Sequence, residues 1–444
     1  MHKVDAIVVG AGPAGTTAAL TLALAGARVV LLERAETPGG KNMFGGMVVA
    51  CAAPEELLPG FWQDAPWERQ VVKRVLTVVG EHSATTVAYH GDGSAADSAP
   101  AAARVSSDAL VGTGLTLFRP RFDRWYAERA RDAGVTLLTG CLVEGLVLQN
   151  GRVSGVRVAR PDGVLEAPVV VLCDGTLSLL GKDAGLHQGF RPDQLALGVR
   201  ALYRLPEEQI AERFGLVGQQ GATQEFLGCT EGVRGGGFVY TQTETLAVGV
   251  VLHLDSLKIR CLAPYQLLER FVASPYVATL IRGGRLVEYS AHLLPEGGLK
   301  MVPRLSGAGV LVAGDAAALC YTNGLAQEGM NLAMTSGKLA GEVAVEAVAA
   351  GDVSAARLAA YDERLRESFV LRDMKTYDRA VHLLHRDRIF SAYPKMVGAL
   401  MDGLYRSDCE PKRRLGRLGR TAMGGRVALR ELVVDLVEAG RSYL

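Results

Sequence analysis

Residues 4–33 read VDAIVVGAGPAGTTAALTLALAGARVVLLE, and this stretch decides the fold of the chain. An apolar run opens it and is followed at once by Gly10, Gly12 and Gly15, which form the pattern G-x-G-x-x-G. In this pattern the first glycine makes a tight turn, the second lets the backbone approach a pyrophosphate, and the third lets a helix pack closely on the strand. The Ala- and Leu-rich residues that follow predict that helix, whose N-terminus offers unpaired N–H groups to phosphate. The stretch therefore predicts a dinucleotide-binding βαβ unit.

The second strand of this unit ends on an acid. Residues 28–32 are mainly apolar and lead to Glu33, whose carboxylate is placed to accept hydrogen bonds from the hydroxyl groups of an adenosine ribose. An acid here suits an unphosphorylated ribose, so the sequence favours FAD or NAD over NADP, with the neighbouring Arg34 as a complication. A glycine-rich turn in an ordinary βα unit is the structural alternative.

A second motif near residue 310 separates FAD from NAD. An apolar run at 310–313 predicts a buried strand that ends in Gly314 and Asp315, and a long helix is expected to start near Gly324. Asp315 can accept a hydrogen bond from a ribityl hydroxyl, while the helix N-terminus stabilises negative charge on a reduced flavin. The combination favours FAD, and a crossover with an incidental aspartate is the alternative.

A glycine-rich loop follows the first motif. Residues 37–49 hold four glycines around Lys41, Asn42 and Met43. This composition suits a backbone that comes close to the ribityl or isoalloxazine part of the cofactor, or else a flexible surface turn.

The next segments predict a helix and a small antiparallel sheet. Residues 119–133 have the pattern of an amphipathic helix that begins at Arg119, a side chain that either reaches the cofactor phosphates or is a solvated surface charge. Residues 141–173 read as strands around a tight turn at Asn150 and Gly151, and the last strand is expected to return to the first sheet. Such a layer would cover the adenine ring.

Composition narrows the class of protein. At 444 residues the chain suggests two or three packed subdomains, and 49% hydrophobic with 21% charged residues describes a globular protein. The net charge of +1 gives no reason to expect nucleic acid as a partner. Seven cysteines without a C-x-x-C pair argue against an internal iron–sulfur cluster or zinc site. With no signal peptide or membrane-spanning run expected, we predict a cytoplasmic protein, or a peripheral one on the inner face of the cell membrane.

The C-terminal part is predicted to be helical and locally basic. Between Arg406 and Arg430 there are eight Lys or Arg residues and two Asp or Glu residues, and apolar residues at helical spacing precede them at 393–404. Such a run is either a solvated helical face or a surface that contacts anionic lipid or an acidic protein.

With these residues in view, the chain resembles the Fix-type electron transfer flavoprotein:quinone oxidoreductases, the FixC family, within the geranylgeranyl-reductase-like flavoproteins. The resemblance covers essentially the whole chain. Its most specific passage is GGKNMFGGMV at 39–48, and three others are VVGAGPAGTTAAL, LFRPRFDRWYAERARDAGV at 117–135 and GDAAALCYTNGLAQEGMNLAMTSGKLAGE at 314–342.

The predicted fold is α/β. A Rossmann-like FAD-binding domain of the glutathione-reductase type is expected over 1–190 and 300–345, with an inserted mixed-sheet substrate or quinone domain at 191–299 and a helical C-terminal region at 346–444. No catalytic side chain and no metal ligand is predicted. The residues expected to bind FAD are Gly10, Gly12, Pro13, Ala14, Gly15, Glu33, Arg34, Lys41, Asn42, Met43, Arg119, Val143, Asp174, Gly175, Gly314, Asp315, Gly324, Gly329 and Met330.

Two passages depart from the patterns of related flavoproteins. Cys320 and Tyr321 stand in a turn where the family usually lacks such a pair, and Cys173-Asp174-Gly175 stands where hydroxylases carry a longer A-D-G-x-x-S pattern. The second departure makes an FAD-dependent hydroxylase less favoured.

The resemblance implies a route for electrons. An FAD subunit would receive them from an electron transfer flavoprotein of alpha and beta subunits, with a separate ferredoxin-like iron–sulfur subunit, and pass them to a membrane quinone. A prenyl-chain reductase of the geranylgeranyl type is the second interpretation, and a non-catalytic subunit that holds FAD for assembly is the third. The sequence does not identify the quinone or the immediate electron donor. It also does not show whether the complex bifurcates electrons.

Overall fold

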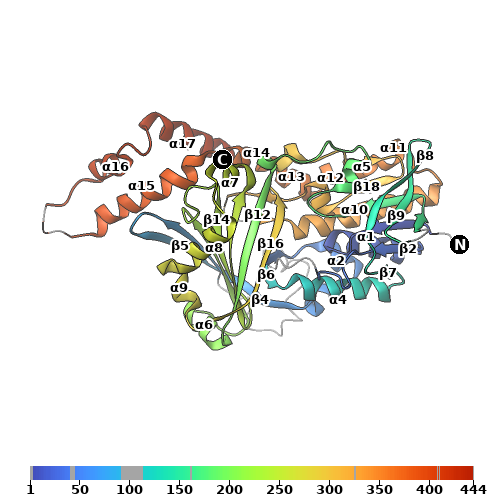
Figure 1. Ribbon diagram of the computed structural model, residues 1–444, viewed down its shortest axis with the longest axis horizontal. Helices are drawn as coiled ribbons and strands as arrows, with labels where there is room; N and C mark the ends of the chain where they lie inside the picture. Colours follow the sequence, from blue (N-terminus) through green and yellow to red (C-terminus); the bar gives the residue numbers. More distant parts are fainter. Residues whose placement is uncertain are drawn as a thin grey trace.

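The computed structural model describes residues 4–40, 46–91, 114–160, 163–324, 327–407, 409 and 411–443. It is elongated, with one sheet toward the N-terminal end, a second sheet in the middle and a helical arm at the other end (Figure 1). Lys41, Asn42 and Met43 of the predicted glycine-rich loop lie outside the described residues.

The first sheet carries the nucleotide-binding motif. It has six strands in the order β17-β18-β11-β1-β2-β7, and the five from β18 to β7 are parallel. Its strands are β1 (Ala6–Val9), β2 (Val29–Leu32), β7 (Thr136–Leu138), β11 (Val169–Leu172), β17 (Ser306–Gly307) and β18 (Val310–Val312). The strands β1, β2, β11 and β18 are buried at every position, as expected of a sheet covered on both faces. The predicted βαβ unit and the return of residues 169–172 to this sheet are confirmed.

Helices cover this sheet closely. Helix α1 (Pro13–Leu24) packs against α10 (Met330–Ala350) and α4 (Arg119–Asp132). Proline at the first helical position suits the start of α1, because its missing N–H would have no partner there. Gly337 of α10 lets the two helices touch, since a Cβ there would lie 2.1 Å from the carbonyl oxygen of Ala14. Further elements near this sheet include α2 (Ala52–Leu57), α3 (Phe61–Asp64), α5 (Leu179–Asp183) and the 3-10 turn η4 (Gly314–Ala317).

Helix α10 begins later than the sequence predicts. A helix near Gly324 was expected, but β19 (Tyr321–Thr322) and β20 (Gln327–Glu328) pair in an antiparallel hairpin, and α10 starts at Met330 with Gly329 as its N-cap. The prediction was wrong because two-residue strands leave no periodic pattern that would mark the hairpin in the sequence.

The second sheet has nine strands and is mostly antiparallel. Its order is β16-β12-β15-β14-β13-β4-β6-β3, with β5 paired to β4. The strands are β3 (Met47–Val49), β4 (Trp67–Val79), β5 (Ala84–His90), β6 (Gly114–Leu117), β12 (Leu195–Arg204), β13 (Gln220–Leu227), β14 (Gly235–Thr241), β15 (Thr245–His253) and β16 (Arg285–Pro295). A separate apolar core lies between this sheet and helices α6 (Glu207–Phe214), α8 (Pro264–Ala273) and α9 (Pro275–Ile281).

Four strands of this sheet come from residues 47–117, which the sequence-based division grouped with the FAD-binding part. The alternation of β4 predicts a strand, but it does not reveal that β13 pairs with it in parallel, across more than a hundred residues. The domain boundaries themselves stay a prediction.

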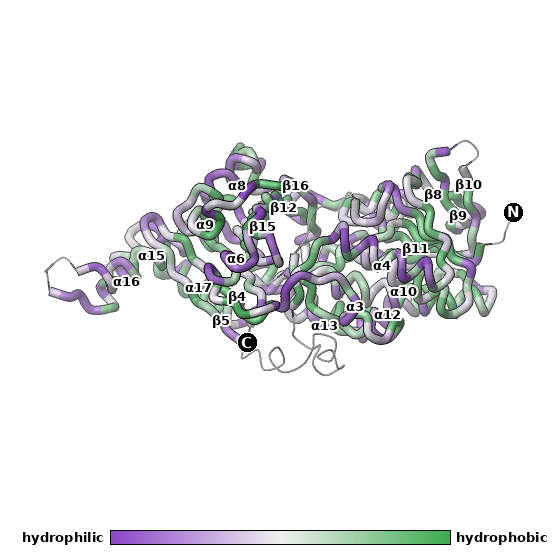
Figure 2. Tube along the Cα trace, turned by 90° about the horizontal axis from the view of Figure 1, so that it is seen from below, coloured by the Kyte–Doolittle hydropathy of each residue, from purple (hydrophilic) through white to green (hydrophobic). Residues whose placement is uncertain are grey.

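A three-stranded sheet lies beside the first sheet. Its order is β10-β9-β8, from β8 (Val143–Gln149), β9 (Arg152–Val158) and β10 (Val164–Glu166). Asn150 and Gly151 join the first two with φ angles of +53° and +75°, the conformation of the predicted tight hairpin turn. The strand β11, which lies beside this small sheet, consists of Val and Leu only, and the tube is green there (Figure 2).

The C-terminal residues are helical, as predicted, and end in an arm. The helices are α11 (Ala355–Leu358), α12 (Ala360–Glu367), α13 (Phe369–Thr376), α14 (Asp378–Leu384), α15 (Asp387–Tyr405), α16 (Leu415–Met423) and α17 (Leu429–Tyr443). Helices α15, α16 and α17 form the arm, which projects away from the first sheet (Figure 1). The side chains of Arg386, Arg388 and Tyr393 all hydrogen-bond the carboxylate of Asp435, which fastens α17 to the base of the arm. Over the part of the chain that is described, no helix is both long and apolar enough to cross a bilayer.

Candidate cofactor site

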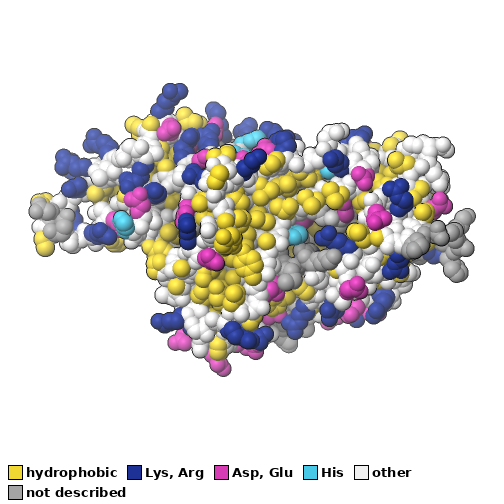
Figure 3. Space-filling model, in the orientation of Figure 1, with side chains coloured by type: hydrophobic (Ala, Val, Ile, Leu, Met, Phe, Trp, Pro, Cys, Tyr) yellow, Lys and Arg dark blue, Asp and Glu magenta, His cyan; other side chains and the backbone are white. Residues whose placement is uncertain are grey.

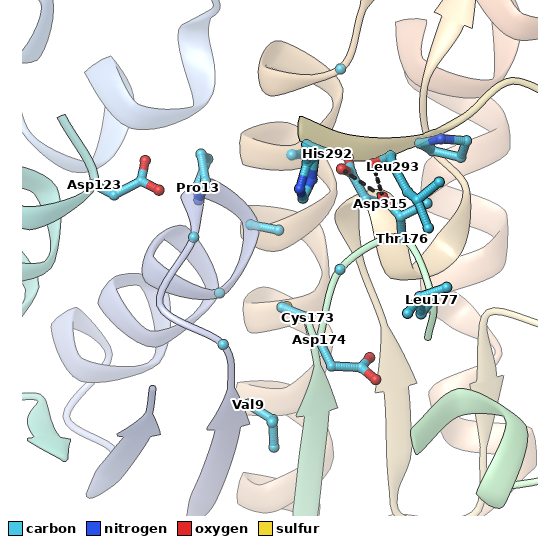
Figure 4. Close-up of a pocket in the computed structure, with 18 of the residues that line it drawn as sticks. Val9, Pro13, Asp123, Cys173, Asp174, Thr176, Leu177, His292, Leu293 and Asp315 are labelled. Carbon is cyan, nitrogen blue, oxygen red and sulfur yellow. Dashed lines mark hydrogen bonds between the residues drawn. The ribbon is translucent and has the colours of Figure 1, made fainter. Parts of the chain in front are cut away.

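A cavity of about 840 Å³ lies between the two sheets. It opens at the carboxyl ends of β1, β2, β11 and β18, where ligands bind in doubly wound sheets. The first sheet contributes the glycine loop and the turns after β2 and β11. The second sheet contributes β16 and Tyr240 on β14. Figure 4 shows residues from both walls converging on the cavity.

The three glycines of the motif have different surroundings. A Cβ at Gly15 would lie 1.9 Å from the carbonyl oxygen of Gly10, and one at Gly10 would lie 2.3 Å from that of Cys173. At Gly12 the only atom of the described residues within 4 Å of such a Cβ would be Arg119 Nη2, at 3.7 Å. Gly10 and Gly15 are therefore needed for packing, whereas Gly12 leaves open space at the N-terminus of α1. Unpaired N–H groups at that terminus suit a pyrophosphate.

Glu33 is held at the end of β2. Its Oε2 accepts the Ala11 N–H at 2.9 Å and its Oε1 accepts the Ala35 N–H at 2.8 Å. Each carboxylate oxygen keeps a further lone pair, so hydroxyl groups of a ribose can still donate to it. Arg34 lines the same part of the cavity.

Arg119 faces the cavity rather than solvent. Its guanidinium forms two hydrogen bonds of 2.9 Å with the carboxylate of Asp123, and the two side chains are 14% and 1% exposed. Burial raises the pKa of Asp123, while the Arg119 guanidinium opposes that rise. Because Arg119 is also the neighbour of Gly12, a positive charge stands beside the space left for phosphates.

The opposite end of the cavity holds a polar cluster. Thr176 Oγ1 donates to the carbonyl oxygen of Leu293 at 3.0 Å and lies 3.5 Å from Asp315 Oδ2 (Figure 4). Burial lowers the pKa of His292 and the Asp315 carboxylate opposes this, so the imidazole is neutral near pH 7. A carboxylate and a neutral imidazole therefore lie side by side, where hydroxyl groups of a ribityl chain can be bound.

Together these groups fit FAD. Open space at a helix N-terminus with an arginine beside it suits the pyrophosphate, Glu33 suits the adenosine ribose, and Asp315 suits the ribityl chain.

Most of the predicted residues meet at this cavity. Those that line it are Gly10, Gly12, Pro13, Ala14, Gly15, Glu33, Arg34, Arg119, Val143, Asp174, Gly175, Asp315, Gly329 and Met330. Gly314 lies behind the wall, because a Cβ there would lie 2.7 Å from Ala14 Cβ, and its N–H donates to Ser336 Oγ. Gly324 is exposed in the loop between β19 and β20, away from the cavity lining.

Sequence reasoning missed several lining residues. They are Thr176, Leu197, Tyr240, His292, Leu293 and Gln327. Most lie on strands of the second sheet or on the small hairpin, where no motif marks them. Cys320 was noted only as a departure from the family pattern, and it too lines the cavity. Among the residues that the structure describes, no three His, Cys, Asp or Glu side chains are grouped as metal ligands would be.

Comparison with protein families matches three parts of the chain. Residues 5–181 match the family "FAD dependent oxidoreductase", residues 195–294 match "ETF-QO, ubiquinone-binding", and residues 380–444 match the "ETF-QO/FixC family C-terminal domain".

Similar proteins cover nearly the whole chain. The probable electron transfer flavoprotein-quinone oxidoreductase YdiS of Escherichia coli K12 is 38% identical over 417 residues, 94% of each chain. Protein FixC of the same strain is 41% identical over 407 residues, 91% of each chain. Protein FixC of Azorhizobium caulinodans is 39% identical over 416 residues, 93% of this chain and 92% of its own.

Solved structures share the fold. A geranylgeranyl bacteriochlorophyll reductase-like protein from Thermoplasma acidophilum aligns with a TM-score of 0.71 at 19% identity, over 98% of this chain and 99% of its own. The myxobacterial chondrochloren halogenase, an FAD-dependent enzyme, aligns with a TM-score of 0.64 at 18% identity, over 97% and 99%. The predicted cofactor and the α/β fold class are confirmed, and this chain is an FAD-dependent oxidoreductase that belongs to the ETF-QO/FixC family.

Proposed function

We propose that this protein passes electrons from an electron transfer flavoprotein, through its FAD, to a membrane quinone. The observation that carries the proposal is the shared cavity. One wall is the glycine motif, and the other includes β16, which falls within the segment that matches the ubiquinone-binding family. A quinone bound on that wall would lie beside the cofactor.

Strand β16 offers an apolar route from the surface to the cavity. Because side chains alternate along a strand, Tyr289, Ala291 and Leu293 share one face of it, and a register shift places Val287 at a β-bulge beside them. Val287 and Tyr289 are 37% and 50% exposed, whereas Ala291 and Leu293 line the cavity. In Figure 3 hydrophobic side chains gather over the surface where β12 and β16 lie. An edge strand with this pattern suits a prenylated quinone that arrives from a bilayer, and hence a peripheral position on the inner face of the membrane.

The residues around the cavity would bind and orient rather than react. When bound, FAD supplies both one-electron and two-electron chemistry, which links a single-electron donor to a two-electron acceptor. Arg119 and the N-terminus of α1 would hold the phosphates, and Glu33 the ribose. Leu197 and Leu293 would keep water away from the quinone side.

The helical arm suits a protein partner. Helix α17 exposes an apolar face, with Leu429, Val433, Leu436 and Val437 between 49% and 63% exposed. The neighbouring residues 412–420 carry five of the basic residues of the C-terminal run. An exposed apolar face and a basic segment in the same arm favour an acidic partner, and a ferredoxin-like iron–sulfur subunit fits that chemistry. Such a subunit would offer the electrons a second acceptor besides the quinone. Electron bifurcation is tested by measuring whether one donor reduces both the iron–sulfur subunit and the quinone.

A substitution on β16 tests the quinone route. Tyr289→Asp places a charge on the apolar face, and we expect the KM for a soluble quinone analogue to rise at least tenfold, because burying a charge against an apolar ligand is unfavourable. FAD content and thermal stability should stay as in wild type. Tyr89→Asp is the matched control, since Tyr89 is 68% exposed on the other edge strand, β5.

Three outcomes would contradict the proposal. One is an unchanged KM in Tyr289→Asp. Another is a flavin-loaded protein that accepts no electrons from any electron transfer flavoprotein yet saturates a prenyl double bond, which would favour the prenyl-chain reductase. The third is a loaded protein inactive in both assays, which would favour the assembly subunit.

A further inference from the structure

Hydrogen bonds connect the cavity wall to a buried histidine–glutamate pair, and a second histidine packs against that pair near the base of the arm. Gln327 lines the cavity, and its Nε2 donates to Glu296 Oε1 at 2.6 Å. The other oxygen, Oε2, lies 3.1 Å from Nε2 of His253. Beyond it the ring of His385 meets His253 edge-on, with ring centroids 5.6 Å apart. These residues come from β20, the end of β16, the end of β15 and the end of α14, so only the folded chain brings them together.

The hydrogen bonds assign the protons of the buried pair. The side chains of His253 and Glu296 are 6% and 9% exposed. A carboxylate only accepts, so the N–H of His253 is assigned to Nε2, and Nδ1 is left as a lone pair. That Nδ1 is buried without a hydrogen-bond partner among the described residues. One more proton there would turn the pair into a buried imidazolium–carboxylate ion pair, in which the added charge already has its counter-ion.

His385 stands between this pair and solvent. Its Nδ1 lies 2.8 Å from the carbonyl oxygen of Val381, and its Nε2 lies 3.2 Å from that of Asp193. Since both neighbours only accept hydrogen bonds, the imidazolium form of His385 satisfies both ring nitrogens. The residue is half-buried and follows the last turn of α14, where a positive charge is favoured. His385 can therefore hold a proton beside the pair.

The other polar groups near His253 and Glu296 are a buried cysteine and several charged side chains. Cys320 Sγ lies 3.7 Å from Gln327 Nε2, and burial, with the Asp315 and Glu296 charges, raises the pKa of Cys320 well above its usual range. It stays a thiol and holds no exchangeable charge. Charged or titratable groups on these elements and the segments beside them include Asp193, Arg234, Asp255, Glu288, His292, Asp315, Glu328, Asp378, Arg379, His382 and Asp387. Of these, Arg234 donates from Nη1 to the carbonyl oxygen of His385 at 3.1 Å. Arg234 is paired with the carboxylates of Asp255 and Asp387.

We propose that His253 and Glu296 form a proton-loading site for this cavity. When electrons enter the cavity, Nδ1 of His253 takes one proton from solvent, and Glu296 remains its counter-ion. This inference rests on the proposed function, in which the reduction of one quinone consumes two electrons from the electron transfer flavoprotein and two protons. His253 holds one proton while the electrons reside in the cavity and releases it to solvent when they leave, so that Nδ1 is again a lone pair, and the two protons that the quinone consumes come from solvent.

The first test counts protons rather than turnovers. The midpoint potential of bound FAD, followed by absorbance between pH 6 and 8, gives the number of protons taken up per two electrons. His253→Gln keeps an amide that can donate to Glu296 but binds no proton, so uptake should fall by up to one proton per FAD. His382→Gln is the control, because His382 is 53% exposed on α14 and its hydrogen bond is to Lys300. Equal uptake in wild type and His253→Gln would overturn the proposal.

A second measurement needs no variant. Nitrogen NMR of histidine-labelled holoenzyme reports whether Nδ1 of His253 is a lone pair or an N–H. We expect a lone pair in the oxidised protein and an N–H in the reduced protein, and an unchanged signal would refute the loading site. Glu296→Gln, which removes the counter-ion, should abolish the change.

The outcomes separate this inference from the proposed function. If the protein reduces quinone while proton uptake is the same in His253→Gln, the loading site fails alone. If uptake depends on His253 but no quinone is reduced, the proposed function fails and the loading site stands.

Discussion

Replacing Gly12 by alanine should remove the cofactor while the fold is retained. The φ of Gly12 is −81°, which any residue adopts, and within the described part of the chain a Cβ there would meet only Arg119 Nη2, at 3.7 Å. We therefore expect the unfolding free energy of the apoprotein to change by no more than about 1 kcal/mol, the scale of an altered N-cap. The methyl group instead occupies the space open to the pyrophosphate. Losing one or two charge-assisted hydrogen bonds costs about 2–4 kcal/mol, which is about a 30- to 700-fold rise in Kd for FAD.

Gly15→Ala is the contrasting variant in the same motif. Its Cβ would lie 1.9 Å from the carbonyl oxygen of Gly10, so the backbone must move, and overpacking of this kind costs about 1–3 kcal/mol or more. Apoproteins would be compared by denaturant unfolding, and FAD binding by quenching of flavin fluorescence. Binding by Gly12→Ala within threefold of wild type, or equal stability of the two apoproteins, would refute the reasoning.

Two further predictions concern charged groups. Arg119→Leu leaves the carboxylate of Asp123 buried without its ion pair. Denaturant unfolding of the apoprotein should therefore show a free energy of unfolding that is lower by roughly 3–5 kcal/mol. Replacing both residues by leucine should restore the stability but not the affinity for FAD. Burial raises the pKa of Asp435, but hydrogen bonds from Arg388 and Tyr393 outweigh it and lower the pKa to about 2. This depressed pKa stabilises the fold by roughly 2 kcal/mol above pH 4, and the stabilisation is lost as pH falls toward 2. Hydrogen exchange in α17 should therefore be faster in Asp435→Asn than in wild type at pH 6. The difference between the two proteins should vanish near pH 2.

The first sheet was predictable because its signals are local. A buried run, a glycine turn and an acid at fixed spacing specify β1, α1 and β2, and the structure places all of them as expected. For Arg119 the sequence left two interpretations, although Asp123 lies four residues later on the same helix face, and that spacing was available as a signal for an ion pair.

The second wall of the cavity was not predictable in the same way. Tyr240 and His292 reach the cavity only because β14 and β16 occupy particular places in a nine-stranded sheet. Those places depend on pairings between distant residues, such as Glu225 with Leu76 across β13 and β4, which no local pattern encodes. The hairpin of β19 and β20, after which α10 begins at Met330 and not near Gly324, likewise depends on a strand pairing that no local pattern encodes.

The way the polypeptide crosses between its sheets limits how this protein can be recombined. The chain leaves the first sheet after β2 to build β3 through β6, returns for β7, and leaves again after β11 to build β12 through β16. A chimaera that changes quinone preference would therefore need two exchanged segments, 47–117 and 195–295, grafted together. Swapping either one alone would join mismatched strands at the β4–β13 seam, leaving the flavin chamber with a broken wall.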